Sequence, residues 1–228
     1  CLLLGGQPVE QIADAGHDSV PVPQYHQAHQ HQRLPAHKGT TQFLAYALHL
    51  AQLLGILRRA LGHGGEIGLD FYWSKDYKEE QIAAFEAQVE MAIKYDLPIV
   101  VHTRDAWAEM CEVMEKFAGR GVRGVFHAFS DDVDSYQKLK KCGDFLFGVG
   151  GVVTFKKSKL AEVVKQMDLT DIILETDCPY LTPVPHRGER NESSYVRFIC
   201  AKVAELKDVD YQLVADQTTA NAKRIFKL

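Results

Sequence analysis

After residue 65 the sequence alternates between short apolar runs and longer amphipathic segments, and this alternation constrains the fold more than any other feature. Runs of strand length lie near residues 65–70, 98–102, 121–127, 145–149 and 172–176. Apolar residues recur at helical spacing over 77–95, 105–117, 131–141, 158–167, 194–206 and 211–226. Strands that alternate with helices predict βα units and a parallel sheet. The continuous apolar runs are typical of strands covered on both faces.

The length of the chain suits a single barrel of such units. A parallel α/β barrel runs to about 250 residues, and this chain has 228. Eight strands would require three more from residues 1–65, where little strand pattern is found. We therefore expect an α/β fold, a TIM-like (β/α) barrel that is incomplete at its N-terminus.

Residues 1–64 differ in composition from the rest and are interpreted as a separate, atypical segment. By count, residues 1–65 hold seven of the ten histidines but only seven of the charged residues, against 49 in residues 66–228. Residues 25–37 are a polar Gln/His tract, and residues 42–61 are apolar nearly all round a helix. A buried helix is the expected structure of residues 42–61, and a membrane-surface helix is the alternative.

Charge and cysteine content narrow the class of protein. The net charge of −4 argues against a generally basic nucleic-acid coat, although a local basic patch stays compatible with it. Five scattered cysteines without a C-x-x-C pair favour free thiols in a reducing cytoplasm. We recognise no transmembrane stretch and no feature that predicts an obligate protein partner.

Four of the apolar runs end in a residue able to bind a metal ion. These residues are Glu66, His102, His127 and Asp177. In a parallel barrel the carboxyl ends of the strands meet at one rim, so residues far apart in sequence converge there. Each residue alone also fits a structural role, as a core histidine or a helix cap. Their joint occurrence at successive strand ends favours a divalent-metal site.

A metal at this rim implies hydrolytic chemistry. It would lower the pKa of a bound water from about 16 to about 7. Asp177 is the expected metal ligand and general base, because a carboxylate that contacts both metal and water can accept the proton during attack. Glu66 is the second expected catalytic residue and would bridge the ions if two are bound.

Several residues near the rim have the chemistry to bind substrate. His186, Arg187 and Arg190 follow the Asp177 strand, and Arg104 lies two residues after His102. Guanidinium and imidazole groups suit a phosphate. A solvated loop with ordinary surface charges is the alternative for residues 183–191.

An aromatic run follows the first predicted strand. It consists of Phe71, Tyr72 and Trp73, close to Glu66. These rings could stack on a nucleic-acid base, or they could pack under the loop. The sequence leaves both readings open.

Residues 65–228 resemble the TatD family of metal-dependent deoxyribonucleases and related hydrolases, in the amidohydrolase-like barrel superfamily. The matching motifs are Gly65-Glu66-Ile67-Gly68-Leu69-Asp70, Val101-His102-Thr103-Arg104-Asp105-Ala106, Phe126-His127-Ala128-Phe129-Ser130, Leu174-Glu175-Thr176-Asp177-Cys178-Pro179-Tyr180-Leu181, Pro185-His186-Arg187-Gly188, Arg190-Asn191-Glu192 and Thr219-Ala220-Asn221-Ala222. The resemblance implies that the four candidate ligands lie on the fourth, fifth, sixth and eighth strands of a barrel. It also implies hydrolysis of DNA phosphodiester bonds, typically from the 3′ end, with one or two Mg²⁺, Mn²⁺ or Zn²⁺ ions.

The N-terminal segment departs from the family pattern. Family members begin with a strand that carries an Asp-Thr-His-x-His-Leu type motif, which is absent here. His29-Gln30-His31 has the spacing but stands in a polar tract without an apolar strand before it. We hypothesise that residues 1–64 are a wrong-frame or misassembled translation joined to a genuine TatD-type sequence. A single reading frame across codon 65 on resequencing would contradict this hypothesis.

Two alternatives to a deoxyribonuclease remain at this point. One is a barrel metallohydrolase for a small ester, amide or phosphoester, because fold and metal alone do not define the substrate. The other is an inactive remnant that lacks the first-strand metal ligands. A pure DNA-binding module is disfavoured by the acidic balance.

Overall fold

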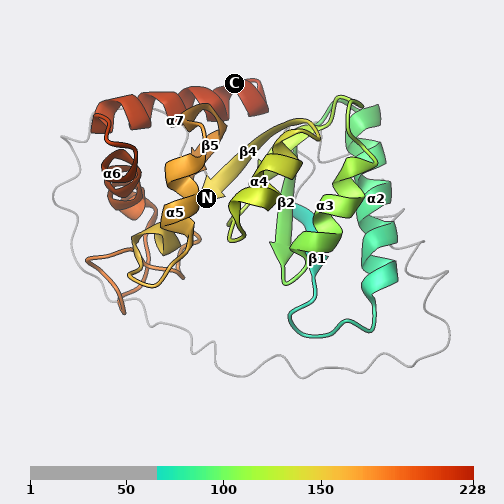
Figure 1. Ribbon diagram of the computed structural model, residues 1–228, viewed down its shortest axis with the longest axis horizontal. Helices are drawn as coiled ribbons and strands as arrows, with labels where there is room; N and C mark the ends of the chain where they lie inside the picture. Colours follow the sequence, from blue (N-terminus) through green and yellow to red (C-terminus); the bar gives the residue numbers. More distant parts are fainter. Residues whose placement is uncertain (1–65) are drawn as a thin grey trace, which may run out of the picture.

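The structure, a computed structural model, describes residues 66–228 (Figure 1). The helix predicted over residues 42–61, the candidate histidines His29 and His31, and the proposed boundary after residue 64 lie outside the described residues. The hypothesis about the origin of residues 1–64 therefore stays a prediction.

The described part is built on one parallel sheet. Its strands, in spatial as well as sequence order, are β1 (Glu66–Asp70), β2 (Ile99–Arg104), β3 (Arg123–Phe126), β4 (Asp144–Val149) and β5 (Ile172–Leu174). All five predicted strands are present and parallel, so the prediction of βα units is confirmed. Within residues 66–228, β1 and β5 are the two edges of the sheet.

The six predicted helices are also present, with ends that differ from the prediction by a few residues at most. They are α2 (Lys78–Lys94), α3 (Trp107–Glu115), α4 (Val133–Lys140), α5 (Leu160–Gln166), α6 (Val196–Lys207) and α7 (Tyr211–Phe226), with short 3₁₀ turns at η1 (Gly151–Thr154), η2 (Leu169–Asp171) and η3 (Ser193–Tyr195). Two helix starts have side-chain caps. Asp132 accepts a hydrogen bond from the Ser135 backbone N–H, and Asp210 accepts one from Gln212.

Successive residues of β1 and β2 point alternately into the core and towards the face that carries the candidate ligands. On β1 and β2, Ile67, Leu69 and Val101 are buried in the main core with residues of α2 and α3. The residues between them, such as Glu66 and His102, are less buried and point to the opposite face. Helices α2 and α3 thus cover one face of these strands, and Glu66 and His102 lie on the other face.

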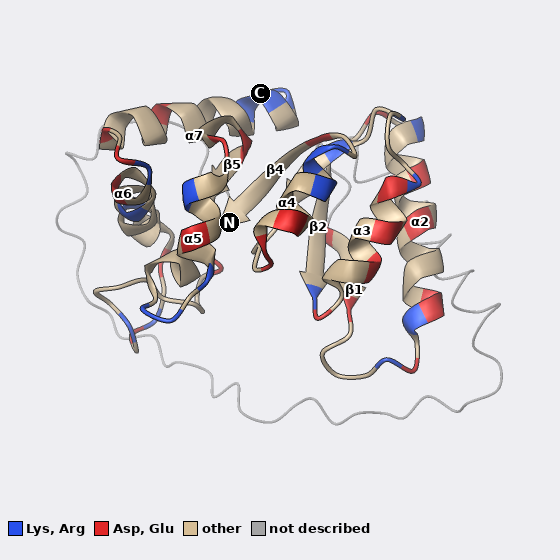
Figure 2. Ribbon diagram, in the orientation of Figure 1, with Lys and Arg blue, Asp and Glu red and all other residues tan. Residues whose placement is uncertain are grey.

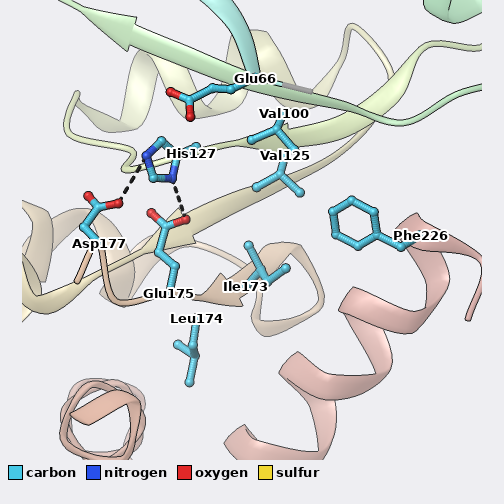
Figure 3. A pocket seen from close by; sticks show the side chains of 9 residues that line it. All are labelled: Glu66, Val100, Val125, His127, Ile173, Leu174, Glu175, Asp177 and Phe226. Carbon is cyan, nitrogen blue, oxygen red and sulfur yellow. Dashed lines mark hydrogen bonds and ion pairs between the residues drawn. The ribbon is translucent and has the colours of Figure 1, made fainter. Parts of the chain in front are cut away.

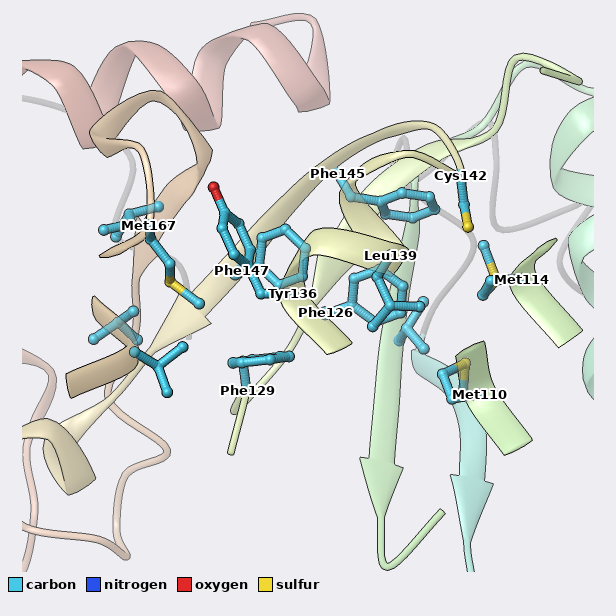
Figure 4. Close-up of a cluster of buried hydrophobic side chains, with 14 of the residues drawn as sticks. Met110, Met114, Phe126, Phe129, Tyr136, Leu139, Cys142, Phe145, Phe147 and Met167 are labelled. Carbon is cyan, nitrogen blue, oxygen red and sulfur yellow. The ribbon is translucent and has the colours of Figure 1, made fainter. Parts of the chain in front are cut away.

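An aromatic cluster occupies the centre of the core (Figure 4). The ring of Phe147 on β4 is stacked with Phe126 at 5.5 Å between centroids and meets Phe129 and Tyr136 edge-on at 5.2 and 4.9 Å. All four side chains are at most 1% exposed. Strand β4 is therefore fixed to β3 and α4 through one ring.

Replacing Phe147 with alanine is expected to lower the free energy of unfolding by about 3–5 kcal/mol, because the truncation leaves a cavity among rings that cannot all close in. Urea unfolding of the full chain would measure this loss. The control is Leu213→Ala on α7, a half-exposed position, where a change within about 0.5 kcal/mol is expected. Equal losses in the two variants would contradict the central role of Phe147.

Two further sequence predictions concern thiols and membranes. Cys111, Cys142, Cys178 and Cys200 are free, as predicted for the described cysteines. From residue 66 to the C-terminus, no helix has both the length and the apolar character required to cross a membrane.

Candidate metal centre

The structure corrects where two of the candidate ligands stand on their strands. His127 and Asp177 lie beyond the carboxyl ends of β3 and β5, as predicted. Glu66 instead is the first residue of β1 within the described residues, and His102 lies inside β2. The prediction of four strand ends was wrong for these two, because parallel pairing continues past them as far as Asp70 opposite Arg104.

Strand alternation nevertheless places these side chains on one face of the sheet. Glu66 pairs with Val100, and His102 pairs with Gly68 in the same register. Residues two apart share a face, so His102 lies one step beyond Val100 towards the carboxyl end of β2. The pairing of Val101 with Phe126 places His127, the residue directly after β3, beside His102.

His127 stands between two carboxylates (Figure 3). Its Nδ1 lies 3.0 Å from Oε2 of Glu175, and its Nε2 lies 3.2 Å from Oδ1 of Asp177. The hydrogen bond to Glu175 is the main cause that raises the pKa of His127 to about 9, and the charges of Asp177 and Glu66 add to it, against the opposing effect of burial. The carboxylates around His127 therefore strongly favour a positive charge at this position.

His102 has the same kind of surroundings. Its Nδ1 lies 3.4 Å from Oε1 of Glu66, and its Nε2 lies 3.2 Å from Oδ2 of Asp70. The hydrogen bond with Glu66 raises the pKa of His102 and lowers the pKa of Glu66. The face therefore carries two imidazoles, each flanked by two carboxylates.

A cavity of about 170 Å³ opens between β1, β3 and β5. Its polar wall brings together Glu66, His127, Glu175 and Asp177 (Figure 3). Its apolar wall consists of Val100, Val125, Ile173, Leu174 and Phe226. Three of the four predicted ligands thus share one cavity, and His102 adjoins it through its contact with Glu66.

The donor set and its spacing fit a divalent cation. Two ligands at about 2.1 Å from an ion, at ordinary coordination angles, lie about 3.0–3.4 Å apart. The Nε2–Oδ1 distance of 3.2 Å between His127 and Asp177 and the Nδ1–Oε1 distance of 3.4 Å between His102 and Glu66 agree with this spacing. In residues 66–228 no three such side chains converge on one point. The described part therefore offers two ligand pairs rather than a closed cluster.

Comparison with known proteins identifies the family of this chain. The family model described as "TatD related DNase" matches residues 60–227. The chain belongs to the TatD family.

Curated relatives of this TatD chain are named for metal-dependent hydrolysis. YabD of Bacillus subtilis, an uncharacterized metal-dependent hydrolase, is 39% identical over 165 residues, which cover 72% of this chain and 64% of YabD. YcfH of Escherichia coli K12, named in the same way, is 34% identical over 165 residues, 72% of this chain and 62% of YcfH. The chain thus spans less than two thirds of the length of these relatives.

Solved TatD structures share the fold. YjjV, a TatD homologue from Escherichia coli K12, superposes with a TM-score of 0.73 at 25% identity and covers 81% of this chain and 71% of YjjV. A TatD family hydrolase from Entamoeba histolytica gives a TM-score of 0.66 at 23% identity, over 81% and 70% of the two chains. The TIM-like barrel class is confirmed.

Two carboxylates that contact the candidate histidines were not predicted as site residues, namely Glu175 and Asp70. Glu175 reaches His127 across β4 because Gly148 has no side chain, and a β-carbon there would lie 2.5 Å from Oε2 of Glu175. The Ala128 backbone N–H also donates to Oε1 of Glu175 at 2.5 Å. The spacing of two between Glu175 and Asp177 at the end of a predicted strand was the available signal, since residues two apart in a strand share a face.

The predicted substrate residues of the loop after β5 are held mostly within that loop. The His186 ring is stacked on Tyr195 at 4.4 Å, and its Nδ1 lies 2.8 Å from Oε2 of Glu189. The Arg187 guanidinium lies 3.8 Å over the ring of Phe155 and donates to a backbone carbonyl of its own loop. Arg190 is exposed and forms no ion pair with another described residue. None of the three lines the cavity.

Arg104 lies at the carboxyl end of β2, on the same face as His102. Its guanidinium carbon lies 3.4 Å over the ring of Tyr72. It makes no ion pair with any carboxylate in residues 66–228. Arg104 is therefore the predicted substrate residue that the structure places nearest to the candidate ligands along a strand.

Proposed function

We propose that this chain is a divalent-metal-dependent deoxyribonuclease that releases nucleotides from the 3′ end of DNA. The observation that carries the proposal is the pair of imidazoles, each between two carboxylates, on one face of a parallel sheet at a cavity. Membership of the TatD related DNase family supports DNA as the substrate. The relatives named metal-dependent hydrolases support a metal cofactor.

The residues of the site would have different roles in binding the metal and orienting its ligands. When bound, a divalent cation supplies Lewis-acid activation of water and of the phosphodiester. His127 and Asp177 would hold it on one side, and His102 with Glu66 on the other. Glu175 would accept a hydrogen bond from Nδ1–H of His127, which would leave the lone pair of Nε2 to bind a cation at the cavity.

Proton transfer falls to Asp177 in this proposal. Its carboxylate lies 23% exposed at the cavity, next to His127, where a water attacking phosphorus would lose its proton. Glu66, on the opposite side of the cavity, would bridge the ions if two are bound. Mg²⁺, Mn²⁺ and Zn²⁺ all suit this mixed nitrogen and oxygen donor set.

Basic residues near the carboxyl ends of the strands would meet the DNA backbone. Arg104 lies at the end of β2, and Arg187 and Arg190 lie on the loop after β5; the distribution of basic residues is shown in Figure 2. Guanidinium groups bind phosphate oxygens by paired hydrogen bonds. A few arginines on a chain of net charge −4 are consistent with binding of one strand rather than coating of a long duplex.

The proposal is tested with the full chain and a single-stranded oligonucleotide that carries a fluorophore at its 5′ end. We expect a ladder shortened from the 3′ end with Mg²⁺, Mn²⁺ or Zn²⁺, no products with a chelator, and none from His127→Ala. Hydrolysis of a lactone or a phosphotriester in place of DNA would contradict the proposal and favour a small-substrate hydrolase.

A further inference from the structure

We propose that Tyr72, Trp73 and Arg104 form a subsite that stacks an unpaired nucleotide base beside the metal centre, and that this subsite gives the enzyme a preference for single-stranded ends. The identity of the ligand rests on the proposed function. The subsite itself is argued from the exposure, anchoring and position of these three side chains.

The aromatic run after β1 contains one buried ring and two exposed rings. Phe71 is 3% exposed and belongs to the main core. Tyr72 and Trp73 are 51% and 77% exposed, although they follow directly in sequence. Phe71 is therefore the ring that packs under the loop, and core packing does not explain why Tyr72 and Trp73 are aromatic. Exposed rings that adjoin Arg104, on the strand face that carries His102, fit a ligand with a flat face.

The backbone that carries the Tyr72 ring is anchored by hydrogen bonds. The backbone N–H of Tyr72 donates to Oδ1 of Asp70 at 3.0 Å, and that of Phe71 donates to the Arg104 carbonyl at 2.9 Å. The Tyr72 and Trp73 rings meet edge-on, with centroids 4.8 Å apart. A ring fixed in advance loses less conformational entropy when a base stacks on it.

Arg104 adds a cation with unused hydrogen-bonding capacity. Its guanidinium is stacked on the Tyr72 ring, and among the described residues it has no carboxylate partner. Stacking occupies one face of the guanidinium and leaves its N–H edge for a phosphate. Aromatic rings combined with an arginine are the usual chemistry for an unpaired strand.

The position of the subsite matches its proposed role. Arg104 follows His102 by two residues on the same face of β2, about 6–7 Å further along the strand. A nucleotide whose phosphate lay at His102 and His127 would bring its neighbouring base to Arg104 and the rings. In a duplex that base is already stacked and paired, so only an unpaired end can use the subsite.

Tryptophan fluorescence provides a test that needs neither metal nor activity. The chain has two tryptophans, and Trp107 packs against Phe129 at 4.8 Å, so Trp107→Phe leaves Trp73 as the reporter. In a chelator-containing buffer, we expect quenching by a short single-stranded oligodeoxynucleotide and little by an abasic oligonucleotide of equal length and charge. Equal quenching by both, or none by either, would overturn the inference.

A kinetic comparison tests the same subsite during turnover. Trp73→Ala is expected to raise KM for single-stranded DNA about tenfold, the effect of losing one base-stacking ring, with a smaller change on blunt duplex. The control is Tyr77→Ala, a ring that is 61% exposed four residues away, which should leave KM unchanged. An unchanged KM in Trp73→Ala overturns the inference. If the parent chain hydrolyses no DNA, the proposed function fails, and the fluorescence titration still decides on the subsite.

Discussion

Replacing Asp177 with asparagine is expected to lower kcat/KM for single-stranded DNA by about three orders of magnitude, because the proposed general base and a metal ligand are lost together. The carboxylate stands 3.2 Å from Nε2 of His127 at the wall of the cavity. Asparagine has nearly the same shape but bears no charge and accepts no proton. The fold should therefore remain while the chemistry is lost.

Calorimetric metal titration separates the two roles of Asp177. We expect weaker binding of Mn²⁺ or Zn²⁺ in Asp177→Asn, together with an unfolding midpoint close to that of the parent chain without metal. Asp134→Asn is the matched control, since within residues 66–228 its exposed carboxylate pairs only with Lys138 on α4. Activity within a few-fold of the parent in Asp177→Asn would rule out the assigned role.

Replacing Gly148 with alanine is expected to lower kcat/KM by about 10- to 100-fold, although Gly148 touches no proposed ligand. A β-carbon at this position would lie 2.5–2.6 Å from the carboxylate atoms of Glu175. Glu175 would have to move, and its hydrogen bond of 3.0 Å to Nδ1 of His127 would be lost. His127 would then be free to turn, and its Nε2 would leave the orientation towards Asp177.

A matched control lies two residues away on the same chain. At Gly150 the nearest atom to an added β-carbon, Cγ of Glu175, is 3.8 Å away, an ordinary contact. Gly150→Ala should therefore keep both activity and metal affinity. Both variants are compared by kcat/KM and by calorimetric Mn²⁺ affinity, with Glu175→Gln as the direct test of the same hydrogen bond. Equal effects at Gly148 and Gly150 would show that Glu175 does not position His127.

The elements of the fold could be predicted from the sequence because their signals are local. The helix over Tyr211–Phe226 was predicted with the bounds that it has in the structure, since apolar residues at helical spacing mark it from end to end. The length of β2 was underestimated. Its apolar run stops before His102, whereas hydrogen bonding to β1 continues to Arg104. Over residues 102–104 only every second residue of β2 is buried, so an apolar run no longer marks the end of the strand.

The candidate ligands were predictable as residue types, but the groups that orient them were not. Glu175 contacts His127 across 48 positions of sequence, and only through space left by Gly148. Such a gap has no local signature. The ring contacts of His186 and Arg187 could not be predicted from the sequence either. Both residues were assigned to phosphate from their charge, and the structure stacks them on Tyr195 and Phe155.

Alternation along β1 and β2 has a consequence for how proteins of this kind can diverge. Ile67, Leu69 and Val101 are buried in the core, and the residues interleaved with them carry the candidate chemistry. Neighbouring residues of these strands are therefore under different constraints, one set from core packing and the other from the candidate chemistry. Mutations at one set of positions can retune a reaction while the other set preserves the scaffold, so a lineage can explore new substrates without first rebuilding its interior.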